Sequence, residues 1–202
     1  MLAVSLLLLA GNTAAQRFQL GLFGGIQHVF EYGAIEDYVL GENDFPVTPA
    51  HTPAALGASF SVFVTKNLGL EADARYILSS KVKLTDPSDQ DSFELDTASH
   101  YTLTLNVFYQ FPAGDFMLYI LAGGGIDTVR AKDAVHISAY GFEITVEAPE
   151  SKTDPVADFG GGLVYSVNDT LGIRLDVRYA VIFAVPAEIA GLNTALGVVV
   201  RF

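Results

Sequence analysis

From residue 18 to the end of the chain, large apolar residues alternate with smaller or polar ones along eight separate segments. A period of two is typical of β-strands, because successive side chains of a strand point to opposite faces. Each segment has about the 9 to 11 residues that a tilted strand needs to cross a bilayer. None has the period of an amphipathic helix. The segments are 18–31, 55–65, 69–78, 99–110, 116–127, 156–167, 171–182 and 192–202.

The connections between these segments alternate strictly in length. Three are tight, at 65–68, 111–115 and 168–170, and four are long, at 32–54, 79–98, 128–155 and 183–191. Strict alternation, an even strand count and both termini at the short-turn end are typical of barrels in the outer membrane. The sequence therefore predicts an all-β fold, an eight-stranded antiparallel up-and-down transmembrane β-barrel.

Composition narrows the remaining classes of protein. Half of the 202 residues are hydrophobic, but no run of about 18 apolar residues could span a bilayer as a helix. The absence of cysteine excludes a disulfide framework, a thiolate metal site and a thiol nucleophile. A net charge of -12 argues against a nucleic-acid partner, whose phosphates would repel the chain.

The first residues have the layout of a secretory signal peptide. An apolar core from Leu2 to Ala10 precedes small residues, with Thr13 and Ala15 fitting a cleavage site after residue 15. We therefore expect a signal peptide at 1–15 and a barrel domain at 16–202. No Lys or Arg precedes the apolar core, so the true initiator methionine could lie upstream. The alternative is a buried strand or helix of the mature fold.

The two faces of the segments indicate what lines the barrel. In 171–182, aliphatic residues share one face and Arg174, Asp176 and Arg178 share the other, a pattern that also fits a soluble sheet. In 18–31 and 99–110 the minor face is small or uncharged and polar, unlike the Lys and Glu of a solvated sheet. Such residues suit a narrow lumen that side chains must fill.

The expected inward face carries four acids and four bases. Because an unpaired buried charge is costly, this balance predicts a salt-bridge network that plugs the lumen. The alternative is a charged ring that selects ions. The predicted network consists of Glu31, Glu71, Asp73, Arg75, Arg174, Asp176, Arg178 and Arg201.

An internal repeat relates two hairpins. "NLGLEADARY" at 67–76 aligns with "TLGIRLDVRY" at 170–179, an offset of 103 residues, with Asp73, Arg75 and Tyr76 matching Asp176, Arg178 and Tyr179. Hairpins four strands apart would face each other across an eight-stranded barrel. Chance similarity between alternating strands is the alternative.

These features together resemble the small outer membrane β-barrels typified by the transmembrane domain of outer membrane protein A and by outer membrane protein X. The resemblance rests on the signal, the eight segments, "GGGLVYSVNDTLGIRLDVRY" and the terminal Phe202. It implies a monomer in the outer membrane of a Gram-negative cell, in contact with outer membrane lipids and lipopolysaccharide, with no cofactor. It also implies that the barrel assembly machinery reads Phe202 as an assembly signal.

The long connections with their strand ends hold 17 acids, among them Asp127, Asp154 and Asp158, against five bases. These acids could bind bridging divalent cations loosely or could simply be solvated. Within 128–155, "AVHIS" and "FEITVE" alternate around "AYG". This predicts a projecting hairpin, a candidate edge for a surface partner, or a strand extension that only packs on its neighbour.

Taken together, the sequence predicts a structural or surface-interaction (adhesion-type) protein with a lumen plugged by side chains, and not an enzyme. A narrow porin-like channel for ions or small solutes is the first alternative. A lipid A-modifying hydrolase is the second, because His136, Ser138 and Glu150 can be laid over the deacylase triplet. The Asn that directly follows the Ser in that family is Ala139 here. The four histidines have no metal-ligand spacing, so no metal site is expected.

Overall fold

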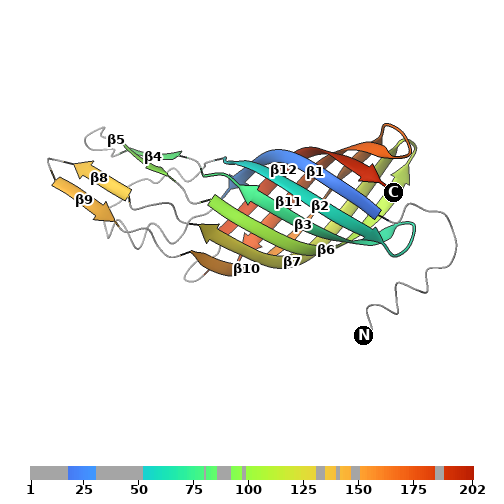
Figure 1. Cartoon of the computed structure of the whole chain (residues 1–202), viewed down its shortest axis with the longest axis horizontal. Helices are drawn as coiled ribbons and strands as arrows, with labels where there is room; N and C mark the ends of the chain where they lie inside the picture. Colours follow the sequence, from blue (N-terminus) through green and yellow to red (C-terminus); the bar gives the residue numbers. More distant parts are fainter. Residues whose placement is uncertain are drawn as a thin grey trace.

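The computed structural model describes residues 18–30, 52–79, 81–85, 92–96, 99–130, 135–139, 142–146, 151–184 and 189–202. The predicted signal peptide at 1–15 lies outside the described residues. Eight strands close into a barrel (Figure 1): β1 (Phe18–Val29), β2 (Ala54–Phe63), β3 (Leu68–Ile77), β6 (Ser99–Ala113), β7 (Phe116–Arg130), β10 (Lys152–Ser166), β11 (Leu171–Ile182) and β12 (Ile189–Arg201).

Every neighbouring pair in the barrel is antiparallel, and β12 pairs with β1 to close the wall. The predicted eight-stranded antiparallel up-and-down barrel is therefore confirmed. No helix in the described ranges is long and apolar enough to cross a membrane.

The register of the strands sets their tilt. Followed from Gln19 through successive paired residues, the ladder returns to β1 at Val29, ten residues farther along. A stagger of this kind around eight strands goes with a tilt of about 35–45° and an interior that side chains fill. Inward residues of neighbouring strands therefore lie at successive heights, which arranges the lumen in layers.

Alternation divides the two faces of the wall. On β1, Gln19, Phe23 and Gln27 are buried in the lumen, whereas Leu22 and Ile26 point outward and are exposed. Large exposed apolar residues continue around the barrel, reaching 61% exposure at Leu105 and 60% at Leu196. A soluble protein would bury this surface, so the wall is built to contact lipid.

Aromatic rings gather on the outer face of the barrel wall, near each of its two ends. Near the turns they pair as Phe18–Phe60, Phe18–Phe202, Tyr109–Phe111 and Phe116–Tyr165. Near the long connections they pair as Tyr76–Tyr101, Phe30–Tyr179 and Phe159–Tyr179. An apolar band between two aromatic girdles is typical of a transmembrane barrel.

The three tight turns lie at one end of the barrel, which we name the turn end. The β2–β3 turn is held by Thr65 Oγ1, which accepts from the backbone N–H groups of Asn67 and Leu68. The β10–β11 turn uses Asn168 Oδ1 in the same way. Gly114, in the β6–β7 turn, has a φ of 67°, a conformation that favours glycine. The C-terminus also lies at the turn end (Figure 1).

Two short hairpins lie beyond the opposite end, which we name the loop end (Figure 1). The predicted hairpin within 128–155 forms, with β8 (Val135–Ala139) paired to β9 (Phe142–Val146). A second hairpin, β4 (Lys81–Thr85) with β5 (Ser92–Asp96), was not predicted. Its strands alternate as "KVKLT" and "SFELD", but they are short and charged and lie in an acid-rich stretch.

Candidate functional site

Six charged residues meet in the middle of the lumen. Glu71, Asp73 and Arg75 point inward from β3, and Arg174, Asp176 and Arg178 point inward from β11. The two strands are four apart in the closed barrel, so they face each other across it. None of the six side chains belongs to a residue more than 8% exposed. We name this group, together with Asp158 of β10, the lumen network.

Arg174 spans the lumen to reach Glu71. Its Nη1 and Nη2 donate to Glu71 Oε2 and Oε1 at 2.6 and 3.0 Å. Nη2 also donates to Asp176 Oδ2 (2.8 Å), and Nε donates to the Tyr119 hydroxyl (2.7 Å). The guanidinium lies 4.6 Å from the centre of the Tyr119 ring. Charged, bidentate bonds of this kind are among the strongest that side chains form.

Arg178 joins more carboxylates than the other arginines of the network. Its Nε and Nη2 donate to the two oxygens of Asp176 at 3.0 and 2.8 Å. Nη2 also reaches Glu71 (2.7 Å) and Asp73 (3.4 Å), while Nη1 lies 3.4 Å from Asp158. Arg178 is only 1% exposed, so its charge depends on these partners and not on water.

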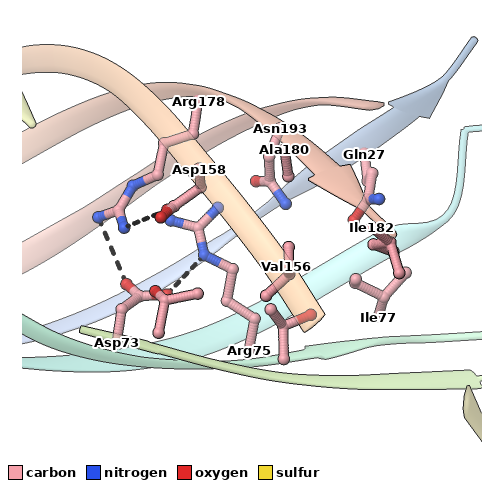
Figure 2. Close-up of a pocket in the computed structure, with 12 residues that line it drawn as sticks. Gln27, Asp73, Arg75, Ile77, Val156, Asp158, Arg178, Ala180, Ile182 and Asn193 are labelled. Atoms are coloured by element: carbon pink, nitrogen blue, oxygen red, sulfur yellow. Dashed lines mark hydrogen bonds and ion pairs between the residues drawn. The ribbon is translucent and has the colours of Figure 1, made fainter. Parts of the chain in front are cut away.

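Arg75 lies at the loop-end side of the network. Its Nε donates to Asp73 Oδ1 at 2.7 Å, and its Nη2 lies 3.9 Å from Asp176 Oδ2. Its guanidinium covers the ring of Phe23 at 5.0 Å. Figure 2 shows Arg75 and Arg178 bonded to the same aspartate, Asp73.

The repeat explains why these charges meet. Arg174 follows Glu71 by 103 residues, which is the offset between the two hairpins. Equivalent positions of the repeat therefore lie opposite each other in the lumen, and the ion pair forms where their charges differ. Any two matching hairpins four strands apart would face each other in this way, so the repeat itself stays a hypothesis.

Several network contacts were not foreseen. The sequence groups Asp158, at a strand end, with the acids of the long connections, whereas in the structure it is 6% exposed and faces Arg178 from β10. Asp127 and Asp154 are likewise buried on β7 and β10. The ladder extends beyond the predicted segments 116–127 and 156–167, to residues 128–129 and 152–155, although these stretches lack apolar alternation. Backbone pairing needs no apolar side chains. Strand ends predicted from the point where apolar alternation stops therefore fall short of the observed ends.

Glycine and amide residues make room for the network. Gly160 pairs with Arg178, and a Cβ at this glycine would clash with the backbone of Val177 and Arg178. The Asn106 amide, with its nitrogen toward Asp158 Oδ1 (2.7 Å), accepts from Arg178 Nη1 at 3.2 Å. The alternation of the sequence predicts that Gly160 and Asn106 face inward. It does not predict which residues they contact.

The two remaining residues of the predicted network are Glu31 and Arg201. Glu31 lies outside the described residues. Arg201 is buried but lies at the turn end, where its Nη1 donates to Ser166 Oγ (3.0 Å) and no ion pair to a described residue forms. As the last residue of β12, it is too close to the mouth to reach the acids of β3 and β11.

An apolar layer lies between the network and the turn end. It consists of Phe108, Tyr119, Leu121, Val164 and Val199, with Phe63 and Met117 packed against it. A cavity of about 30 Å³ remains on the loop-end side of the network, lined by Arg75, Asn193, Gln27 and their neighbours (Figure 2). A second cavity of about 10 Å³ lies beside Glu71 and Arg174. Each has room for only one or two water molecules.

The loop-end mouth holds one further buried polar cluster. Asp127, which is fully buried, is bonded to His100 Nδ1 at 2.9 Å and accepts from Thr102 Oγ1 at 2.6 Å. Within the described part of the chain, no three His, Asp or Glu side chains gather closely enough to hold a metal ion. His136 and Ser138 lie on β8, and Glu150 lies outside the described residues, so that triplet stays a hypothesis.

Phe202 follows β12 on the outer surface and is 60% exposed. Its N–H donates to the carbonyl of Phe18 at 3.1 Å, the carbonyl of Phe202 accepts from Phe18 at the same distance, and the two rings stack. The last residue thus continues the β1–β12 seam. Its role as an assembly signal stays a prediction.

Comparisons with known proteins agree with this geometry. A family model described as the outer membrane protein beta-barrel domain matches residues 1–202. Neisserial surface protein A is 14% identical with a TM-score of 0.59, over 92% of this chain and 97% of that chain. The N-terminal barrel of OprF from Pseudomonas aeruginosa is 13% identical with a TM-score of 0.50, over 93% and 98%.

A third similar structure is Ail of Yersinia pestis, in complex with the heparin analogue sucrose octasulfate. It is 14% identical with a TM-score of 0.51, over 93% of this chain and 99% of that chain. At such identities these likenesses show the fold alone. A comparison with curated proteins gave no match.

Proposed function

Because the chain belongs to the outer membrane protein β-barrel domain family, we propose that it is a sealed outer membrane barrel that acts at the cell surface, in envelope structure or in an adhesion-type contact. Its place is the outer membrane. The turn end then faces the periplasm and the loop end faces outward.

The filled lumen is the observation that carries this proposal. A solute would have to cross a layer of buried ion pairs and a layer of apolar side chains. Two cavities along this path, lined by described residues, measure about 30 and 10 Å³. A porin needs a wider barrel to leave an aqueous channel, so surface activity is favoured over transport.

Planar bilayer recordings test the seal. Purified wild-type protein is expected to give at most rare, small conductance events, and Arg75→Ala, which trims the loop-end side of the network, is the matched variant. A steady, ion-selective conductance in the wild type, altered by Arg75→Ala without loss of the folded band on gels, would establish the channel instead.

The β8–β9 hairpin supports an outward-facing role. It is a two-stranded sheet, so each strand has one edge without a strand partner in the described part of the chain. Such edges can add a strand from another protein. The chain's charge of -12 makes a highly sulfated sugar like the heparin analogue in the Ail complex an unfavourable ligand. We propose a neutral or basic protein partner, with divalent cations bridging the acidic connections to lipopolysaccharide.

Surface proteolysis tests the topology on which this role depends. Protease added to intact cells should cut within 128–155 and spare the turn at 65–68 until the outer membrane is broken. The reverse pattern, or recovery of the protein from the soluble periplasm, would contradict the proposal.

A catalytic role has less support. Two of the similar structures are of a surface protein and an attachment invasion locus protein, and none of the three is named as an enzyme. We therefore propose a non-enzymatic protein. Lipid A is expected to keep all its acyl chains in cells that overproduce the protein. Removal of an acyl chain would instead support the hypothesis of a hydrolase that uses His136, Ser138 and Glu150.

A further inference from the structure

Arg201 differs from the three arginines of the lumen network in how its guanidinium is bonded. Only Nη1 has a partner, Ser166 Oγ, although the residue is 6% exposed. Nε and Nη2 are buried and make no hydrogen bond within the described protein. Leaving charged donors buried and unbonded is costly, because they have lost water and gained nothing in return.

The two unbonded nitrogens form one edge of the guanidinium. Nε and Nη2 point their N–H groups in parallel, which matches two oxygens of one carboxylate or phosphate. Arg178 uses the same edge to bind both oxygens of Asp176, at 3.0 and 2.8 Å. In Arg201 the edge is therefore of a kind that this barrel already uses to bind an oxyanion.

The fold does not require an arginine at this place. In the first half of the barrel the equivalent position is Gln110: its N–H donates to Asn67 O at 2.7 Å, as that of Arg201 donates to Thr170 O at 2.7 Å. Gln110 is also buried and inward. A neutral amide thus meets the structural need, and the buried charge of Arg201 calls for another explanation.

A third side chain completes the surroundings. Gln19 lies directly opposite Arg201 in the β1–β12 ladder and is 2% exposed. Its Oε1 has no hydrogen-bond partner within the described protein. Rotating this amide by half a turn would present an N–H donor in place of the oxygen, on the residue that pairs with Arg201.

We propose that Arg201, Ser166 and Gln19 form an oxyanion-binding site at the periplasmic mouth of the barrel, taking the carboxylate or phosphate group of a periplasmic molecule. The apolar side chains of Phe108, Tyr119 and Val164 line a cavity of about 10 Å³ beside this site, and Gln19 shares that cavity with Glu71 and Arg174 of the lumen network. None of the three residues belongs to the lumen network or to the surface hairpins, so the test of this site is separate from the tests of the seal and of the surface contact.

Arginine Nε–Hε resonances of the 15N-labelled full chain, refolded in lipid nanodiscs, test the site. Acetate and inorganic phosphate are titrated separately, with chloride at equal ionic strength as the control. The Arg201 signal should shift saturably with at least one oxyanion and not with chloride. The Arg174 and Arg178 signals should stay in place, because their Nε groups are bonded to Tyr119 and Asp176.

Three variants sharpen the result. Arg201→Gln copies the other half of the barrel and should abolish the saturable shifts of nearby backbone amides. Ser166→Ala should weaken binding about fivefold, the worth of one hydrogen bond. Arg201→Lys keeps the charge but not the parallel edge, so its affinity should fall about tenfold.

Response to one oxyanion alone would support the site and name its ligand class. Absence of a saturable shift, an equal shift with chloride, or undiminished affinity in Arg201→Lys would overturn the proposal. An Arg201 signal that moves only when Gln19 is replaced by Leu would show that the arginine bonds that amide and binds no anion.

Discussion

The β2–β3 and β10–β11 hairpins are two versions of one design placed on opposite sides of the lumen. Both close their turns with a side-chain oxygen that accepts two backbone N–H groups, and both carry an inward Asp and Arg two residues apart. They differ at the preceding inward position, two residues before the Asp, where one hairpin has Glu71 and the other has Arg174.

This difference shows what must change when two hairpins of similar sequence face each other across a lumen. Identical hairpins would set like charges opposite each other at the centre of a narrow barrel, where no water screens them. One reversal of charge turns this repulsion into the bidentate Arg174–Glu71 pair. The remaining Asp and Arg residues then join the same network through Arg178.

Glu71→Arg makes the two hairpins alike and should have the largest effect. Three guanidinium groups would then crowd at one height of the lumen. We expect a loss of more than the roughly 3 to 5 kcal/mol typical of breaking a buried ion pair. Urea unfolding in lipid vesicles, followed by circular dichroism because the chain has no tryptophan, measures it.

The double variant Glu71→Arg with Arg174→Glu is the control, since it restores opposite charges with their positions exchanged. It should regain at least half of the lost stability. Full recovery is not expected, because the bonds of Arg174 to Tyr119 and of Ser61 to Glu71 are not rebuilt. A double variant as unstable as the two single variants added together would mean that the pair is not coupled.

Arg178→Ala comes next, with an expected loss of about 3 to 5 kcal/mol. It leaves Asp176, Asp73 and Glu71 each short of a partner. Arg75→Ala is the matched change on the other hairpin and should cost clearly less, because Arg75 has one short ion pair and one at 3.9 Å. The temperature at which the folded gel band disappears ranks the two variants, and equal losses would contradict the network as described.

Much of the fold could be predicted because the wall obeys one rule at every residue. Lipid outside and a filled lumen inside force alternation, so strand number, inward parity and tight turns were all visible in the sequence. Strand ends were not. Lys152 to Asp154 and Thr128 to Val129 lie beyond the predicted segments but pair through backbone groups, outside the apolar band, where the rule no longer acts on side chains.

The site could be predicted only in part, for a related reason. Parity showed that Glu71, Asp73, Arg174 and Arg178 point inward, and the repeat suggested that their strands face each other. The height of each residue in the lumen depends on the stagger of all eight strands. That stagger brings Asp158 to Arg178 and leaves Arg201 at the mouth, and alternation alone does not encode it.

The ends of the two halves give a smaller contrast. Phe111 directly follows Gln110, and Phe202 directly follows Arg201, so the two aromatic residues occupy equivalent positions. Only Phe202 is the last residue of the given sequence. Deleting Phe202 removes its stacking on Phe18 and its two backbone hydrogen bonds to that residue, and should cost the refolded protein about 2 kcal/mol. In cells the loss should be larger, with unfolded protein in the periplasm, if the residue is an assembly signal. Normal assembly would remove that role, and Phe111→Ala serves as the control.

The smallest expected effect lies in the two turns. Asn168 Oδ1 accepts its two backbone bonds at 2.9 and 2.7 Å, whereas Thr65 Oγ1 accepts its bonds at 3.3 and 3.0 Å. A typical hydrogen bond contributes about 1 kcal/mol, and longer bonds contribute less. Asn168→Ala should therefore destabilise the barrel more than Thr65→Ala, by about 0.5 kcal/mol. Side-by-side urea midpoints measure the difference. A larger cost at Thr65 would mean that the two hairpins, alike in geometry, are not alike in what stabilises their turns.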